Sequence, residues 1–229
     1  MRYLTVIIIG IFCYSQTTGQ TYELGGFFGG ANYIGDVGDT SIINLQTPVV
    51  GGIFKWNRSK RHAFRFTALF AQLEGDDSES DESRRQLRDY SFEGSLTELS
   101  LGIEYTFWEF NVHSDASAST PYLYTGLTYS FYDQHRLDPT IGNLVSDGTG
   151  SAVAIPMVIG FKKSTRGSLV FGIELGARYA LTDNLDGSAP DGDNAENLQF
   201  GNINNDDWYM FAGVTVTFAF GKKPCYCGF

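Results

Sequence analysis

Residues 96–107 read Leu-Thr-Glu-Leu-Ser-Leu-Gly-Ile-Glu-Tyr-Thr-Phe, and this stretch decides the fold. Every odd-numbered position from 99 to 107 is apolar or aromatic, whereas the even-numbered positions from 98 to 106 hold only Glu, Ser, Gly and Thr. Successive side chains of a β-strand point to opposite faces. The stretch therefore predicts a strand with one apolar face and one face of small or polar side chains.

The same period of two recurs along the chain. Regular alternation predicts further strands at 62–73, 121–132, 151–161, 169–181 and 213–220, and less regular runs at 21–33 and 49–57 bring the total to eight. Most of these runs are roughly ten to thirteen residues long, about twice the usual length in soluble sheets. That length is what a tilted strand needs to cross a bilayer.

The second face of these strands favours a membrane barrel over a soluble one. A soluble sandwich or barrel, the alternative, would carry Lys, Glu and Thr on its wet face, but here that face is mostly Gly, Ala, Ser and Thr. Small residues suit the narrow interior of an eight-stranded barrel. Aromatic residues gather near the strand ends, as an interfacial girdle requires, at Trp56, Phe107, Trp108, Tyr132, Trp208 and Tyr209.

The connections between the predicted strands alternate in length and charge. Residues 57–61 and 162–168 form tight turns and 109–120 a moderate one, whereas 34–47, 74–90, 133–150 and 182–206 are longer. Basic residues gather on the short-turn side, at Arg58, Lys60, Arg61, Lys162, Lys163, Arg166, Lys222 and Lys223, while 182–206 holds six acids and no base. We therefore predict an all-β fold over residues 20–221, an eight-stranded antiparallel transmembrane β-barrel with short periplasmic turns and long acidic external loops.

Composition excludes several other classes. Asp and Glu outnumber Lys and Arg by 26 to 16 in a chain of 229 residues, so the formal net charge is −10. A nucleic-acid partner would require a basic surface. The 18 Phe and 13 Tyr residues argue against disorder, and three cysteines are too few for a disulfide scaffold.

The N-terminus has the layout of a secretory signal peptide. A basic start at Arg2 precedes an apolar stretch from Leu4 to Tyr14 and a small, polar segment that ends near Gly19. The apolar stretch is too short for an ordinary transmembrane helix. We expect residues 1–19 to direct export, and the barrel to lie in the outer membrane of a Gram-negative bacterium with both mature termini in the periplasm.

Charged residues on the inner faces form the main candidate site. Strand parity points Arg65, Glu98, Glu104, Glu174 and Arg178 into the barrel. Unpaired charges in a narrow interior would be very costly, so these side chains must pair with one another or stay hydrated. We interpret them as a structural network that fixes the strand register, because a conducting pore would need more strands.

Catalytic and metal-binding signals are weak. His135 near Ser130 is the one candidate pair for a hydrolase, and nothing resembles a nucleophile elbow. The acid-rich segment 183–196 either binds calcium or is a solvated loop, and it lacks the glycine that an EF-hand needs. We therefore predict no enzymatic activity, no cofactor and no metal site.

The C-terminal segment 222–229 is a basic tail that carries two cysteines. Lys222 and Lys223 precede Pro224, and Cys225 and Cys227 follow it. An oxidising compartment should not leave both thiols reduced. Three alternatives remain open: an intermolecular disulfide with a periplasmic partner, a strained local bridge, and free or metal-bound thiols. In the first case the four side chains would form a partner tether.

A series of short motifs carries a family resemblance over nearly all of the mature chain. In order they are Asn32-Tyr33-Ile34-Gly35-Asp36, Gly75-Asp76-Asp77, Arg84-Arg85, Arg88-Asp89-Tyr90-Ser91-Phe92, Glu98 with Glu104, Ile155-Pro156, Arg178-Tyr179, Leu181-Thr182-Asp183-Asn184-Leu185-Asp186, Gly201-Asn202 and Asp207-Trp208-Tyr209. In their order and spacing the chain resembles the PorG-like outer-membrane proteins of the type IX secretion system.

The resemblance implies a non-enzymatic component of the protein secretion machinery. Its expected partners are a periplasmic ring lipoprotein and that lipoprotein's own partner, besides the lipid of the outer membrane. The alternative from another class is a small outer-membrane barrel that acts in adhesion or ligand binding through its external loops.

Overall fold

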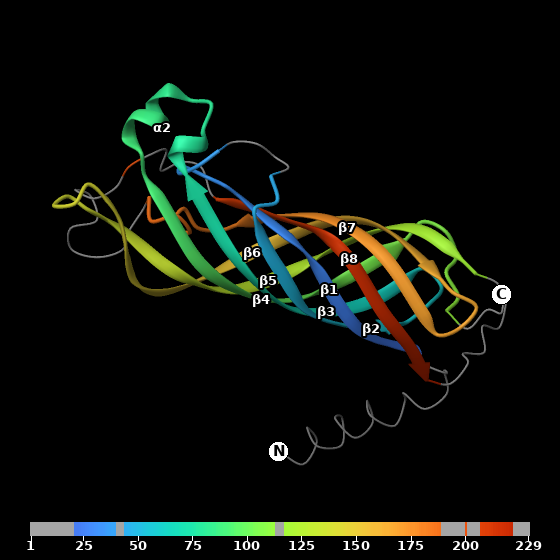
Figure 1. The fold of residues 1–229 in the computed structure, drawn as a ribbon. Helices are drawn as coiled ribbons and strands as arrows, with labels where there is room; N and C mark the ends of the chain where they lie inside the picture. The colour runs from blue at the N-terminus through green and yellow to red at the C-terminus, as the bar shows by residue number, and fades with distance from the viewer. Residues whose placement is uncertain (1–20, 40–43, 113–116, 189–199, 201–206, 222–229) are drawn as a thin grey trace, which may run out of the picture.

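The computed structural model describes residues 21–39, 44–112, 117–188, 200 and 207–221, and these form one closed antiparallel barrel (Figure 1). Its strands are β1 (Thr21–Ile34), β2 (Thr47–Asn57), β3 (His62–Asp76), β4 (Ser91–Thr106), β5 (Ser119–Asp138), β6 (Asn143–Ser164), β7 (Leu169–Ala180) and β8 (Trp208–Gly221). The connection between β3 and β4 holds two short helices, η1 (Asp77–Glu79) and α2 (Ser83–Arg88).

Each strand pairs with its sequence neighbours, and β1 pairs with β8 to close the barrel. The closing register runs from Thr21 opposite Gly221 to Ile34 opposite Trp208. The first residues of β1 and the last residues of β8 therefore lie beside the turns 58–61 and 165–168. We call this end of the barrel the short-turn end. The opposite end is the long-loop end. The predicted eight-stranded antiparallel barrel is confirmed.

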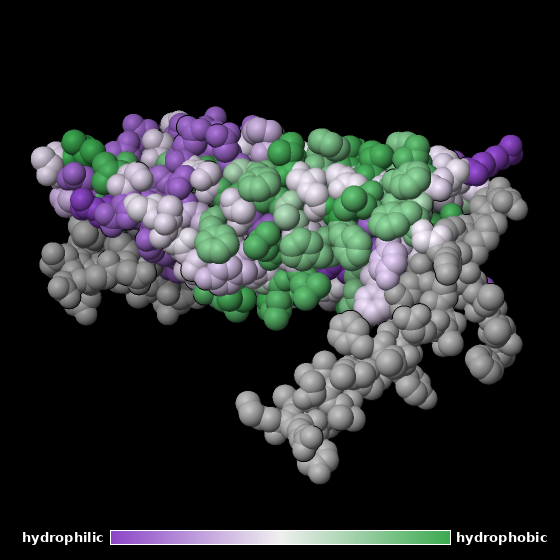
Figure 2. Space-filling view, turned by 90° about the horizontal axis from the view of Figure 1, so that it is seen from below, coloured by the Kyte–Doolittle hydropathy of each residue, from purple (hydrophilic) through white to green (hydrophobic). Residues whose placement is uncertain are grey.

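The outward face of the barrel is apolar. Leu101 is 62% exposed and Leu127 is 65% exposed, although both lie in the middle of their strands. Figure 2 shows apolar side chains gathered over the strands and hydrophilic ones gathered at the long-loop end. An exposed apolar belt of this extent requires an apolar solvent around it, as a bilayer provides. Within the described residues, no helix has the length and hydropathy to cross a membrane.

Glycines on the inner face let β4 and β5 approach closely. Gly102 lies opposite Gly126 in the register. A Cβ atom on Gly102 would stand 2.1 Å from the carbonyl oxygen of Thr125, and one on Gly126 would stand 2.2 Å from that of Leu101. Both positions therefore require glycine, and the small inner face predicted from sequence has this packing role.

The structure corrects the predicted long loop at 133–150. There β5 continues to Asp138 and β6 begins at Asn143, so the two strands form a ribbon that projects beyond the barrel wall (Figure 1). A register shift lies between Asp133 and His135. The ribbon is exposed on both faces over much of its length, so it lacks the apolar alternation by which the other strands are recognised.

The structure also corrects the predicted turn at 162–168. Strand β6 extends to Ser164, and Lys162 is a buried, inward-facing residue of that strand, not a turn residue. The predicted signal peptide 1–19 and the tail with Lys222, Lys223, Cys225 and Cys227 lie outside the described residues, as does most of the acid-rich segment 183–196.

Candidate functional site

A salt bridge spans the lumen of the barrel. Arg65 on β3 donates two hydrogen bonds to Glu174 on β7, with Nη1 to Oε1 at 2.7 Å and Nη2 to Oε2 at 2.9 Å. The Tyr122 hydroxyl of β5 donates to the same carboxylate. Arg65 also stacks over the ring of Tyr124, 4.6 Å from its centroid. This paired fork geometry is the strongest form of an arginine–carboxylate contact.

Glu104 of β4 collects three cations. Its carboxylate lies 2.6 Å from the ammonium of Lys162, 2.7 Å from that of Lys55 and 3.6 Å from the guanidinium of Arg65. All four side chains are almost completely buried. Because Arg65 touches both Glu104 and Glu174, the two carboxylates belong to one network.

A second group lies around Glu98 of β4. Arg178 of β7 pairs with Glu98 at 3.1 Å, and the Tyr209 hydroxyl of β8 donates to it at 3.0 Å. The hydroxyls of Ser130 and Tyr209 share a further hydrogen bond of 2.9 Å. Glu98 thus links β4, β7 and β8.

Near the short-turn end, Glu23 of β1 completes the interior set. Its carboxylate accepts hydrogen bonds from Asn57 at 2.8 Å and from Thr217 at 2.6 Å. The buried Lys, Arg, Asp and Glu side chains within the strands therefore balance, four against four: Glu23, Glu98, Glu104 and Glu174 with Lys55, Arg65, Lys162 and Arg178.

The structure places all five interior residues predicted from the sequence in the lumen, and it brings them together in two groups: Arg65 with Glu104 and Glu174, and Glu98 with Arg178. Sequence reasoning missed Lys55, Lys162 and Glu23. The signal for Lys55 is its parity, because Val49, Gly51 and Ile53 share its inward face, but the two adjacent glycines obscure the alternation of β2. Lys162 was hidden by its neighbour Lys163, because a pair of lysines is typical of a turn.

The buried charged residues of the lumen hold the strands to one another. Each buried carboxylate accepts hydrogen bonds or ion pairs from its neighbours, so the network supplies no exposed acid or base to a substrate. The two groups that the sequence suggested as a hydrolase pair have other contacts: Ser130 bonds Tyr209, and the His135 ring lies 5.6 Å from the ring of Phe92.

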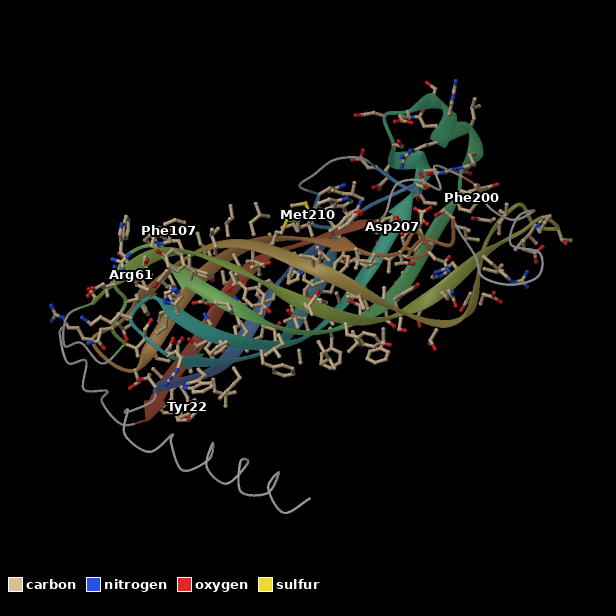
Figure 3. All side chains as sticks on the ribbon, turned by 180° about the vertical axis from the view of Figure 1, so that it is seen from behind. Tyr22, Arg61, Phe107, Phe200, Asp207 and Met210 are labelled. Carbon is tan, nitrogen blue, oxygen red and sulfur yellow. The ribbon has the colours of Figure 1, made fainter. Side chains whose placement is uncertain are left out.

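The connection between β4 and β5 covers the short-turn mouth of the barrel. Phe110 and Val112 are buried there against Val170 and Ala219, from β7 and β8. The ammonium of Lys162 lies 4.5 Å from the centre of the Phe110 ring. An apolar contact thus closes the lumen on the short-turn side of Glu104. Figure 3 shows Phe107 and Arg61 at this end and Asp207 and Phe200 toward the other.

At the long-loop end, buried aspartates tie three connections together. Asp77 pairs with Arg88, with Nε to Oδ2 at 2.7 Å, and accepts the backbone N–H of Gly38 at 2.9 Å. Arg88 also donates to the carbonyl of Asp36 at 2.7 Å. Arg85 donates to the carbonyls of Gly35 and Gly38 at 3.0 and 2.9 Å. The β3–β4 connection is therefore clamped onto the chain that follows β1.

Asp186 and Asp207 fasten the chain between β7 and β8 to the same place. Asp186 accepts the backbone N–H groups of Asp36 and Val37 at 3.0 and 3.1 Å. Asp207 accepts the N–H of Leu185 at 2.9 Å and the hydroxyl of Tyr33. Burial raises the pKa of the Asp207 carboxyl well above its ordinary value, and the nearby Asp186 carboxylate raises this pKa further. We call Asp77, Arg85, Arg88, Asp186 and Asp207 the loop clamp.

The loop clamp consists of side-chain hydrogen bonds to backbone groups and the Asp77–Arg88 ion pair. Within the described residues, no group of three His, Cys, Asp or Glu side chains is placed to hold a metal ion. The acid-rich segment, in which the sequence left calcium binding open, is described only over residues 183–188.

Comparison with solved structures places the fold among outer-membrane barrels. A major outer membrane protein from Thermus thermophilus aligns with a TM-score of 0.51 and 13% identity, covering 88% of this chain and 99% of that one. The N-terminal β-barrel domain of Pseudomonas aeruginosa OprF aligns with a TM-score of 0.46 and 16% identity, covering 88% and 99%.

The Neisserial surface protein A aligns with a TM-score of 0.43 and 9% identity, covering 89% of this chain and 96% of that one. No curated protein matches the sequence. The match to a protein family extends over residues 1–229, and the chain belongs to the family described as "Domain of unknown function (DUF6089)".

Proposed function

We propose that this protein is a non-enzymatic outer-membrane component of the type IX protein secretion machinery and is PorG-like. In this proposal the short-turn end faces the periplasm, and the barrel anchors or contacts a periplasmic ring made of a lipoprotein and its partner. The outer-membrane barrel fold and the apolar belt favour residence in the outer membrane.

One observation carries the proposal: several of the scattered motifs of the PorG-like resemblance meet in one place, at the long-loop end. Segments 32–36, 75–77, 84–92, 181–186 and 207–209 lie far apart in the sequence, yet the loop clamp joins them through hydrogen bonds and one ion pair that are buried or partly buried. A generic small barrel does not need such a joint between three of its connections. The motifs therefore act as one structural unit, which supports reading them together.

The filled interior favours an anchor over a conduit. Eight charged side chains and their hydrogen-bonded neighbours occupy the described lumen, and Phe110 covers one mouth. Secreted polypeptide cannot pass through such a space. Contacts with other components would then be made by the ends of the barrel.

The tail 222–229 supplies a candidate tether on the periplasmic side. We propose that Cys225 or Cys227 forms an intermolecular disulfide, with Lys222 and Lys223 beside it. Non-reducing electrophoresis of native membranes tests this tether. A higher-mass band that collapses with reductant, and is lost when both cysteines are replaced by serine, is expected; a monomer alone in the wild type rules the tether out.

A pull-down distinguishes the secretion role from adhesion or ligand binding through the external loops. The tagged protein is recovered from cross-linked native membranes, beside an equally abundant tagged outer-membrane barrel as the control. Recovery of the ring lipoprotein and its partner with this chain alone is the expected result. If neither ring component is enriched over the control, the secretion role is wrong and the loop-mediated role gains support.

A further inference from the structure

Two neighbouring grooves run along the outer wall of the barrel over β5 to β8. The first lies over Gly160 and is walled by Phe161 and Ile173 together with residues of β5, and its volume is about 470 Å³. The second lies over Gly172, uses the same Phe161 and Ile173, and has a volume of about 470 Å³. The grooves therefore share one wall, and both lie in the half of the wall nearer the short-turn end.

A single wall cation lies on the second groove. Within the described strands, Lys55, Arg65, Lys162 and Arg178 point inward, and Arg136 lies on the projecting ribbon, so only Lys163 points outward from the barrel wall. Lys163 stands opposite Phe171 in the register and lines the groove. The exposed Arg166 lies in the turn that follows.

These two cations have no acidic partner among the described residues. Every other lysine or arginine of the barrel wall pairs with a carboxylate, either inside the lumen or, for Arg136, on the ribbon with Asp147. A lysine stem on an apolar wall extends its ammonium toward the membrane interface. An anion at that level is therefore the expected partner.

A third groove, on another part of the outer wall, serves for comparison. It is walled by Phe66, Leu101 and Leu127, has a volume of about 350 Å³, and contains no charged residue. The face formed by β5 to β8 thus differs from this third groove by combining two joined apolar grooves with an unpaired cation at the interface.

We propose that this face binds one anionic glycerophospholipid, with its two acyl chains in the two grooves and its phosphate against Lys163 and Arg166. Two chains suit two grooves with a common wall, and charge complementarity selects the headgroup. The inference depends on the membrane location in the proposed function, but not on the role in secretion. With the orientation proposed above, the lipid belongs to the periplasmic leaflet.

Native mass spectrometry of the detergent-purified full chain tests the site. The protein is titrated with dioleoyl phosphatidylglycerol and, separately, with dioleoyl phosphatidylcholine. We expect the first bound phosphatidylglycerol to be preferred, and its affinity to fall about fivefold for each of Lys163→Gln and Arg166→Gln. Equal binding of both lipids, or unchanged binding in the double variant, overturns the proposal.

Controls separate this site from folding and from general charge. Arg84→Gln removes an exposed cation at the long-loop end and should leave lipid binding unchanged, while Lys163→Arg should retain it. Heat-modifiable gel migration shows that each variant is a folded barrel. A folded chain that binds no lipid and needs no detergent contradicts the membrane location itself, an outcome distinct from loss of headgroup preference. Displacement of the lipid by millimolar inorganic phosphate would also overturn the role of the grooves.

Discussion

Arg65 and Glu174 bridge the barrel between strands that are not neighbours. β3 and β7 stand on opposite sides of the closed eight-stranded order, and the two side chains meet through paired hydrogen bonds of 2.7 and 2.9 Å. This crossbar ties opposite walls to each other across the lumen. It also joins the carboxylates of Glu104 and Glu174 through one guanidinium.

Removing one end of the crossbar should be worse than removing both. Arg65→Met leaves Glu174 buried with its charge uncompensated, so we expect a loss of about 3–5 kcal/mol in the free energy of unfolding. Arg65→Met combined with Glu174→Leu should cost less than either single change. Urea titration followed by heat-modifiable migration measures each variant. Strict additivity in this cycle would contradict the contact.

Because the outward face of the barrel is apolar, a charged side chain in the middle of a strand should strongly reduce the stability of the barrel. Leu101→Arg places a cation in the apolar belt, and we expect a loss of roughly 2–4 kcal/mol in barrel stability in lipid vesicles. Leu87→Arg is the matched control, because Leu87 is 87% exposed on α2 at the long-loop end. If Leu101 faces lipid, Leu87→Arg should leave the barrel as stable as the wild type, and Leu101→Arg should not. Equal stability of the two variants would argue against lipid around Leu101.

The loop clamp should stabilise the external connections without holding the barrel together. Asp77→Ala removes the partner of Arg88 and of the Gly38 amide. Hydrogen bonds to a charged group contribute about 1.5–3 kcal/mol each, so the β3–β4 connection should open. Limited proteolysis should then cut near residues 77–90 while the barrel keeps its heat-modifiable migration. Asp81→Ala, at an exposed position in the same connection, should leave cleavage as in the wild type.

Asp207 gives the loop clamp a defined pH dependence. Its pKa is raised in the folded state from an ordinary value of 3.8, by burial and by Asp186, so the folded state holds the proton more tightly than the unfolded state. The resulting stabilisation is complete below the ordinary pKa and is lost as pH rises through the raised one. Hydrogen exchange at the Leu185 amide should therefore accelerate with pH beyond the intrinsic increase. In Asp207→Asn the exchange rate of the Leu185 amide should rise with pH only as the intrinsic rate does. If the additional rise persists in that variant, it comes from the titration of another group.

Most of the fold follows from strand parity, because parity depends only on the sequence. The outward Leu101 and the inward Glu98 are both assigned correctly, since neighbouring residues of a strand must face opposite ways. The ribbon at 133–150 could not be found in this way, because residues 146–149 are exposed on both faces and the buried residue opposite them is His135, so no apolar alternation results.

Parity also places residues inside the barrel without saying which of them meet. Arg65 and Glu174 are 109 positions apart, and their contact depends on the stagger between strands, which alternation does not encode. The partners of Glu104 were missed for a related reason. Lys162 and Lys163 are adjacent, yet one enters the lumen and the other faces outward, because the strand continues three residues beyond the apolar run.

The residues of the loop clamp belong to the quoted motifs, but the sequence does not show which of them contact one another. Asp186 and Asp207 cap backbone N–H groups from distant segments, and such contacts leave no period in the sequence. Only the order of the motifs indicated that these segments belong together.

Deletion of the gene, followed by quantification of proteins secreted to the medium, tests the central claim most directly. The deletion strain should lose export of type IX cargo and retain it in the periplasm, and the wild-type gene supplied in trans should restore export. A deletion strain that secretes this cargo at the wild-type level, with its outer membrane otherwise intact, would contradict the role in secretion.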